Sequence, residues 1–143
     1  MEMVNETYYF YIAFENSFCT DYVTEKYFKV LPLDVIPIVR GEADYSDFTP
    51  EKWYIDTKDF ENPKQLAQYL KHLVGSPDKY LEYFKNKELY DSTGYFGIKE
   101  LMAWCDLCEK LNDPKEMQPP SKQLDVSQWW SQRNCQPPFD LNW

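Results

Sequence analysis

The feature that most constrains the fold of this chain is a strand–helix–strand pattern near its start. An uninterrupted apolar and aromatic run spans residues 8–14, and a second run, Val35–Val39, precedes Gly41. Their length and composition are typical of strands buried on both faces of a sheet. Between them, residues 21–31 place apolar side chains at helical spacing until Pro32 ends the pattern. This unit predicts parallel strands joined by a right-handed crossover.

The pattern changes from strands to helices after a short third strand at residues 53–56. Asn62 followed by Pro63 predicts the start of one helix, Pro77 starts a second, and residues 98–111 form a third. The expected buried stripes are Leu66, Leu70, Leu73 and Val74 on the first helix, Tyr80, Leu81 and Phe84 on the second, and Leu101, Met102 and Cys105 on the third. We therefore expect an α/β domain over residues 1–112, with a parallel sheet flanked by helices. A proline-rich tail, residues 113–143, is expected to pack on it.

Composition limits the partners of such a domain. Hydrophobic residues make up 43% of the chain and charged residues 27%, which suits a soluble globular protein. The formal net charge of −9 disfavours nucleic acid as a partner, whereas a small phosphate ligand depends on local donors. The most apolar segment, residues 30–39, contains Asp34 and two prolines and is too short to span a bilayer. The start of the chain has no signal-peptide pattern, so we expect either a cytosolic protein or a targeting segment further upstream.

The loop after the first strand, residues 15–26, carries the densest set of polar side chains. Parallel sheets bind ligands at the carboxyl ends of their strands. A helix expected to begin near Asp21 would present free N–H groups and a positive dipole end to an anion. Tyr22 would add a phenol, Thr24 a hydroxyl and Lys26 a full positive charge. These groups suit a pyrophosphate, although the same residues are also typical of a solvated helix start. The chain has no glycine-rich dinucleotide motif.

Cysteines and a sequon bear on the compartment. The cysteines are Cys19, Cys105, Cys108 and Cys135, and Asn5 begins the sequon Asn5-Glu6-Thr7. Together they favour a secretory compartment, with Asn5 as the glycosylation acceptor. The Cys105-x-x-Cys108 pair fits a redox pair, a zinc half-site or a structural disulfide. The acidic residues show no metal-ligand pattern, so we expect no metal site.

Two neighbouring motifs closely resemble the signature of family 10 glycosyltransferases, the α-1,3/4-fucosyltransferases. They are Phe10-Tyr-Ile-Ala-Phe-Glu-Asn-Ser17 and Asp21-Tyr-Val-Thr-Glu-Lys26. The likeness continues through residues 35–41 and resumes at Cys105-Asp-Leu-Cys108, so that it covers about residues 8–111. The short spacing between the two motifs and the cysteine-rich end are most similar to invertebrate members that act on glycoproteins.

The resemblance implies a GT-B enzyme in which this chain is the Rossmann-like C-terminal half that binds GDP-fucose. By motif position the donor contacts would be Asn16, Tyr22, Val23, Thr24, Glu25 and Lys26. Independently of the motif, we expect further contacts from Tyr45, Arg40 and Glu42, because their loop follows the second strand at the edge where the nucleotide would lie. Lys26 would stabilise the departing diphosphate, and Glu25 would contact the ribose or the oxocarbenium-like fucosyl ring. Fucose would pass to N-acetylglucosamine of a glycoprotein glycan with inversion, without a metal or other cofactor.

The resemblance also implies that a second half of the enzyme lies outside this chain. That half would carry the acceptor site, the carboxylate general base and a single type II anchor that places the enzyme in the Golgi lumen. We therefore expect this chain alone to be inactive or nearly so. The cysteines would form structural disulfides, either within the Cys105–Cys108 pair or with the absent half, and Cys19 would have lost its partner. A non-catalytic module that binds a nucleotide sugar or a partner protein is the alternative interpretation.

Overall fold

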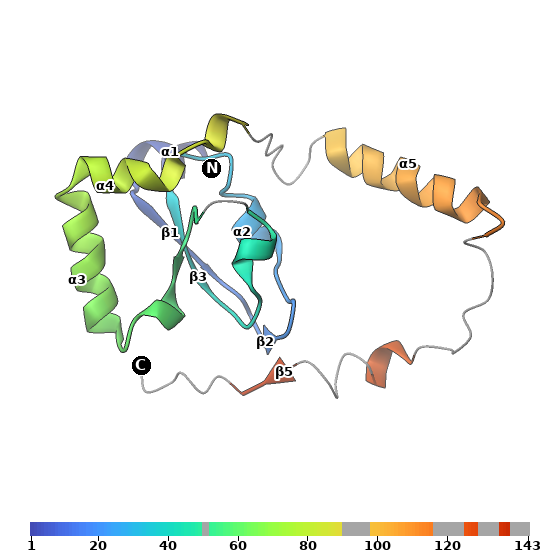
Figure 1. The fold of residues 1–143 in the computed structure, drawn as a ribbon, viewed down its shortest axis with the longest axis horizontal. Helices are drawn as coiled ribbons and strands as arrows, with labels where there is room; N and C mark the ends of the chain where they lie inside the picture. The colour runs from blue at the N-terminus through green and yellow to red at the C-terminus, as the bar shows by residue number, and fades with distance from the viewer. Residues whose placement is uncertain (50–51, 90–97, 116–124, 129–134, 138–143) are drawn as a thin grey trace.

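The computed structural model describes residues 1–49, 52–89, 98–115, 125–128 and 135–137. Its core is a three-stranded parallel sheet in the order β1-β3-β4, which lies in the left-hand part of the molecule in Figure 1. The strands are β1 (Phe10–Phe14), β3 (Ile36–Arg40) and β4 (Ile55–Asp56). The predicted α/β fold with parallel strands is confirmed.

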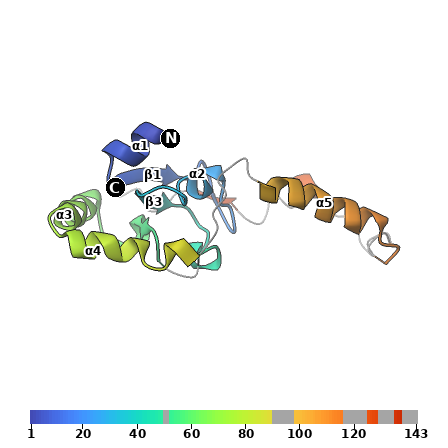
Figure 2. The same cartoon turned by 90° about the horizontal axis from the view of Figure 1, so that it is seen from above.

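The remaining elements surround this sheet or extend from it. The helices are α1 (Glu2–Thr7), α2 (Glu25–Phe28), α3 (Pro63–Val74), α4 (Pro77–Leu81) and α5 (Ile98–Asn112). Short 3-10 turns cover Tyr45–Asp47, Thr57–Asp59, Glu82–Phe84 and Lys87–Leu89. Figure 2 shows α1 on one side of the strands and α4 on the other. A small antiparallel sheet pairs β2 (Phe18–Cys19) with β5 (Cys135–Gln136).

Each face of the parallel sheet buries one apolar cluster. Successive strand residues point to opposite faces, so Val39 belongs to one cluster and its neighbour Ile38 to the other. The cluster on the α2 side contains Ala13, Tyr27, Leu31, Val39, Tyr45, Trp53 and Tyr54. The cluster on the α3 side contains Ile36, Ile38, Ile55, Leu66 and Leu73. The sheet is therefore the common wall of both cores.

Strand β1 differs from the predicted strand that is buried on both faces. Ala13 is fully buried, but the side chain of Ile12 is 65% exposed. The reason is position, because β1 is an edge strand that pairs only with β3 among the described residues. A continuous apolar run predicts a strand, but it does not predict whether the strand lies at the edge or in the centre of the sheet.

The crossover helix is shorter than predicted. The pattern predicted a helix from Asp21 to Leu31, whereas α2 has four residues. Asp21 has a φ of 61°, in the left-handed region, which interrupts a right-handed helix there. The N–H of Thr24, just before α2, donates to the side chain of Glu15 at 2.8 Å. The predicted anion-binding helix end near Asp21 is therefore wrong.

Helices α3 and α4 begin where the sequence predicts. The Asn62 side chain accepts a hydrogen bond from the backbone N–H of Gln65 at 3.0 Å, and Pro63 occupies the first turn of α3. Two residues expected to be buried are exposed instead, Val74 and Leu81. Each lies at the last position of its helix, beyond the part of the helix that meets the core.

Helix α5 matches its predicted range but stands apart from the sheet, as Figure 1 shows. Cys105 was expected to face inward and is exposed, because no core cluster of the described residues includes this helix. Its exposed apolar residues are Trp104, Leu107 and Leu111. The side chains of Leu101 and Met102, and most of the predicted tail, lie outside the described residues. None of the helices in the described part of the chain is long and apolar enough to cross a membrane.

Candidate functional site

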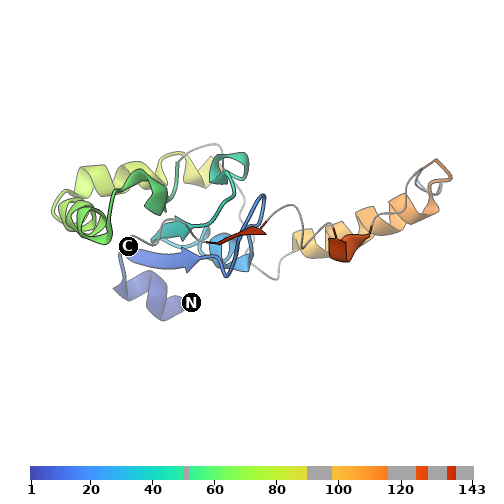
Figure 3. The ribbon, with the colours of Figure 1, turned by 90° about the horizontal axis from the view of Figure 1, so that it is seen from below.

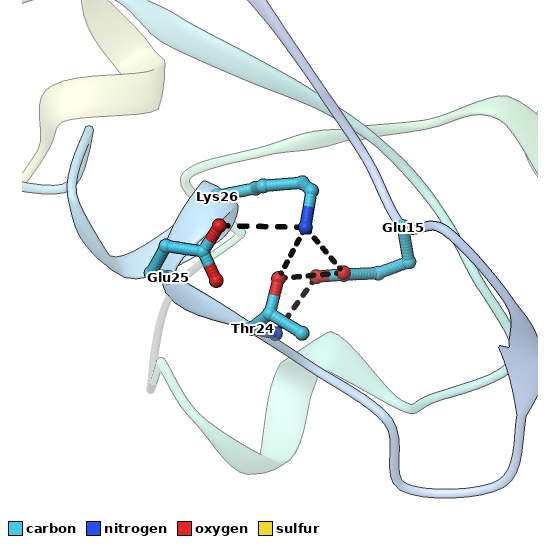
Figure 4. A network of polar contacts seen from close by, with 4 residues as sticks. All are labelled: Glu15, Thr24, Glu25 and Lys26. Carbon is cyan, nitrogen blue, oxygen red and sulfur yellow. Dashed lines mark hydrogen bonds and ion pairs between the residues drawn. The ribbon is translucent and has the colours of Figure 1, made fainter.

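Glu15, directly after β1, organises the loop that follows. Its carboxylate is fully shielded from solvent and accepts two hydrogen bonds from Thr24. The backbone N–H of Thr24 donates to Oε1 at 2.8 Å, and its hydroxyl donates to Oε2 at 2.7 Å, as Figure 4 shows. The Nζ atom of Lys26 lies 3.6 Å from Oε2. These partners compensate the burial of a charge, and they tie the two ends of the loop together.

Lys26 is held by three polar neighbours. Its Nζ atom donates to Thr24 Oγ1 at 2.9 Å and to Glu25 Oε1 at 3.4 Å, besides the ion pair with Glu15. Desolvation lowers the pKa of Lys26, but the carboxylates of Glu15 and Glu25 outweigh it, and the net pKa lies above its ordinary value. The side chain is 31% exposed, so the ammonium is a positioned cation that is still accessible from solvent.

The Glu25 carboxyl lies on the exposed side of this network. Desolvation raises the pKa of Glu25, but its own backbone N–H and the charge and hydrogen bond of Lys26 outweigh this effect. The net pKa of Glu25 therefore lies below its ordinary value, and the group is ionised at neutral pH. Glu25 thus places a negative charge at the outer side of Lys26.

A cavity of about 270 Å³ opens beside Glu15. The described residues that line it are Glu15, Asn16, Ser17, Phe18, Arg40, Cys135 and Gln136. The guanidinium carbon of Arg40 lies 4.5 Å from the centre of the Phe18 ring, which fixes this cation against an aromatic wall. The cavity adjoins the carboxyl ends of β1 and β3, the edge at which parallel α/β sheets bind ligands.

The structure brings part of the predicted donor set to this cavity. Asn16 lines it from the loop after β1, and Arg40 lines it from the end of the neighbouring strand β3. The residues around Glu15, namely Thr24, Glu25 and Lys26, form the adjoining polar network. Thr24 differs from the expected ligand in one respect, because its hydroxyl hydrogen is directed at Glu15.

The other predicted contacts are not among the described residues that line the cavity. Tyr22 is half-buried and contributes to the raised pKa of Lys26, and Val23 packs against the core cluster on the α2 side. Tyr45 is fully buried, with its ring centre 5.1 Å from that of Tyr27. Burial raises the pKa of Tyr45 above its ordinary value. Glu42 is exposed.

The cysteines divide into a bonded pair and two free thiols. Cys19 and Cys135 form a disulfide with Cα atoms 3.8 Å apart, so Cys19 has its partner within this chain and the expectation of a lost partner is wrong. Cys105 and Cys108 are free and exposed on α5. Among the described residues no group of three or more His, Cys, Asp or Glu side chains is arranged to hold a metal ion.

Asn5, the predicted glycosylation acceptor, lies in α1 and is half-buried. Its Oδ1 atom accepts a hydrogen bond from the backbone N–H of Asp34 at 2.6 Å. A glycan would be attached to the other amide atom, Nδ2, and would leave this bond in place. Glycosylation of Asn5 stays a prediction.

Sequence reasoning missed several residues of the site, among them Glu15 and Gln136. Glu15 was quoted only as part of the motif and was given no role. Its position directly after a buried strand is nevertheless a signal, because a carboxylate there can accept hydrogen bonds from the N–H groups of the loop that follows. Gln136 had no local signal, because its place depends on the pairing of Cys19 with Cys135.

A parallel sheet with a polar loop and a cavity at its carboxyl edge defines an α/β ligand-binding domain. Residues 1–129 match the family model described as Glycosyltransferase family 10 (fucosyltransferase) C-term, and the chain belongs to this family. The predicted resemblance is thereby confirmed, and the fold is consistent with the Rossmann-like half of a GT-B enzyme.

Curated relatives include two proteins of Drosophila melanogaster and one of Homo sapiens. Alpha-(1,3)-fucosyltransferase C is 43% identical over 90% of this chain and 29% of its own length. Glycoprotein 3-alpha-L-fucosyltransferase A is 39% identical over 90% of this chain and 25% of its own. The human 4-galactosyl-N-acetylglucosaminide 3-alpha-L-fucosyltransferase is 36% identical over 78% of this chain and 31% of its own. The chain thus spans about a quarter to a third of the length of these relatives.

Proposed function

We propose that this chain is the donor-binding half of an α-1,3-fucosyltransferase and holds GDP-fucose at the carboxyl edge of its sheet. The observation that carries the proposal is the Glu15–Thr24–Lys26 network, which fixes a cation next to a lining residue of the cavity. A second cation, Arg40, lines the same cavity. Membership of the fucosyltransferase family supports the choice of donor.

In this proposal the diphosphate is bound by charge-assisted hydrogen bonds rather than by a helix end. The contact between Lys26 and Glu25 is long and solvent-exposed, so it is weak, and a phosphoryl oxygen can replace it. Glu15 keeps the ammonium of Lys26 in place during that exchange. Thr24 acts as a positioning residue, because its hydroxyl links Glu15 to Lys26.

The transfer step needs charge of both signs. As the bond between fucose and GDP breaks, positive charge grows on the sugar ring and negative charge on the diphosphate. Lys26 and Arg40 stabilise the diphosphate, and Glu25 contacts the ribose or the cationic ring. No metal or other cofactor takes part in this proposal. The acceptor is N-acetylglucosamine of a glycoprotein glycan, in keeping with the name of one Drosophila relative.

The proposal assigns the general base to an acceptor-binding half outside this chain. In the full-length enzyme that half also carries a type II anchor, which places the site in the Golgi lumen. The isolated chain then binds the donor but does not transfer fucose. Product formation by the purified chain, with GDP-fucose and a glycan that ends in N-acetylglucosamine, would show that the base is present after all.

The binding site itself is tested by calorimetry with GDP-fucose and GDP. We expect Lys26→Ala to weaken the binding of both by about tenfold or more, because one charge-assisted bond to the diphosphate is lost. Lys64→Ala, which removes an exposed lysine of α3 far from the site in sequence, is the matched control and should bind as the wild type does. Equal affinity of Lys26→Ala and wild type, or no binding by the wild type, would overturn the proposal.

A further inference from the structure

The C-terminal segment supplies one wall of the candidate site. Strand β5 pairs with β2, which places Gln136 opposite Phe18 and Cys135 opposite Cys19. Figure 3 shows β5 beside the strands at the edge that carries the loop. Cys135 and Gln136 line the cavity together with Asn16 and Arg40. Both lie beyond residue 129, where the match to the family ends.

We propose that β5 is a working part of the donor site, in which Gln136 contacts the donor and the Cys19–Cys135 disulfide holds Gln136 in place. The proposal deepens the proposed function and rests on it. It assigns a binding residue outside the region that defines the family, and it makes donor affinity depend on the state of one disulfide.

The disulfide is needed because the β2–β5 pairing is small. Two residues from each strand form this sheet, and a two-stranded sheet of that size is not stable alone in water. The paired cysteines are 116 positions apart in sequence, so bringing them together without a bond carries a large loss of chain entropy. The bond removes that cost, and it anchors exposed β5 to Cys19, which is buried in the loop.

The carboxamide of Gln136 indicates which part of GDP-fucose this residue contacts. A carboxamide is uncharged and offers both a donor and an acceptor, which suits a hydroxyl group that also donates and accepts. The anionic part of the ligand is matched by Arg40 on the same cavity. Gln136 therefore binds a hydroxyl-bearing sugar of GDP-fucose, while the cations bind the diphosphate.

Reduction gives the disulfide a direct test. Dithiothreitol transfers two electrons to the Cys19–Cys135 bond, which yields two thiols, while dithiothreitol itself closes to a cyclic disulfide. The freed β5 is then held only by its short ladder, and Gln136 leaves the wall. We expect the affinity of the purified chain for GDP-fucose to fall by about threefold to tenfold on reduction.

Calorimetry of the oxidised chain with GDP-fucose separates this proposal from the one on which it rests. Gln136→Ala should lower the affinity by about threefold to tenfold, because one hydrogen bond is lost from an exposed side chain that does not support the fold. The matched control is Gln128→Ala, an exposed glutamine of the same tail that is not among the lining residues. The Cys19→Ser/Cys135→Ser variant should bind weakly with or without dithiothreitol.

The outcomes are distinct. Wild-type affinity in Gln136→Ala, together with the loss expected for Lys26→Ala, would overturn this inference and leave the proposed function standing. No binding of GDP-fucose by the wild-type chain would overturn both. Since Gln136→Ala changes only a surface side chain, the test holds even where the double cysteine variant fails to fold.

Discussion

Helices α3 and α5 are both amphipathic, yet the chain uses them in opposite ways. Leu73 of α3 is 1% exposed and packs against the sheet, whereas Leu107 of α5 is 43% exposed. The apolar stripe of α3 has the β3–β4 face to cover it, and that of α5 has no cover among the described residues. The comparison teaches that an apolar stripe is buried where a face of the sheet lies beside it, as on α3, and stays exposed where no described residue covers it, as on α5.

The largest expected effect comes from the same substitution, leucine to alanine, made once in α3 and once in α5. We expect Leu73→Ala to lower the free energy of unfolding by about 3 kcal/mol, because it leaves a cavity between α3 and the sheet. Leu107→Ala should change it by less than about 0.5 kcal/mol. Urea denaturation followed by fluorescence measures both. Similar losses for the two variants would mean that α5 packs on the core.

A second prediction compares the buried and exposed acidic partners of Lys26. Glu15→Ala should cost about 2–3 kcal/mol of unfolding free energy, because it leaves two donors of Thr24 and the charge of Lys26 without their buried acceptor. Glu25→Ala should cost much less, because that ion pair is exposed. The same urea titration applies, and a larger loss for Glu25→Ala would contradict the assignment of Glu15 as the organiser of the loop.

A third prediction uses pH to report on the core alone. Burial raises the pKa of Tyr27 to about 12, above the value near 10 of an unfolded tyrosine. The unfolded state therefore loses its proton first, and the stabilisation, present in full below pH 10, is lost as pH rises toward 12. The loss for Tyr27 is on the order of 2 kcal/mol.

The alkaline transition is followed by circular dichroism in urea at fixed pH values. Tyr27→Phe should flatten the decline between pH 10 and 12, although it also removes the hydrogen bond to Thr49. Helix α5 contains no tyrosine, so tyrosine ionisation within α5 cannot account for the change. A decline of unchanged steepness in Tyr27→Phe would count against the burial of this hydroxyl as its cause.

The sequence predicts an element correctly where the signal for that element acts over a few neighbouring residues. The parallel strands and the start of α3 were predicted correctly, because apolar runs and the Asn62-Pro63 step act over a few residues. The length of α2 was not, because Glu15 takes the N–H of Thr24 across nine positions. The position of Gln136 at the cavity depends on a disulfide between distant cysteines, and no local pattern encodes it. The motif contains Glu15, Thr24 and Lys26 of the candidate site, but it encodes neither their mutual contacts nor the position of Gln136.

The smallest expected effect measures what a purely local signal contributes. Asn62→Ala removes the side-chain acceptor for the N–H of Gln65 and should cost about 1 kcal/mol, while Asn62→Gly should cost only a few tenths. The loss is smaller than that for Leu73→Ala because packing, rather than capping, supplies most of the stability of α3. Urea denaturation of the three variants ranks these contributions directly. If Asn62→Ala cost as much as Leu73→Ala, α3 would depend on its cap as heavily as on the sheet, and the contrast with uncovered α5 would lose its physical basis.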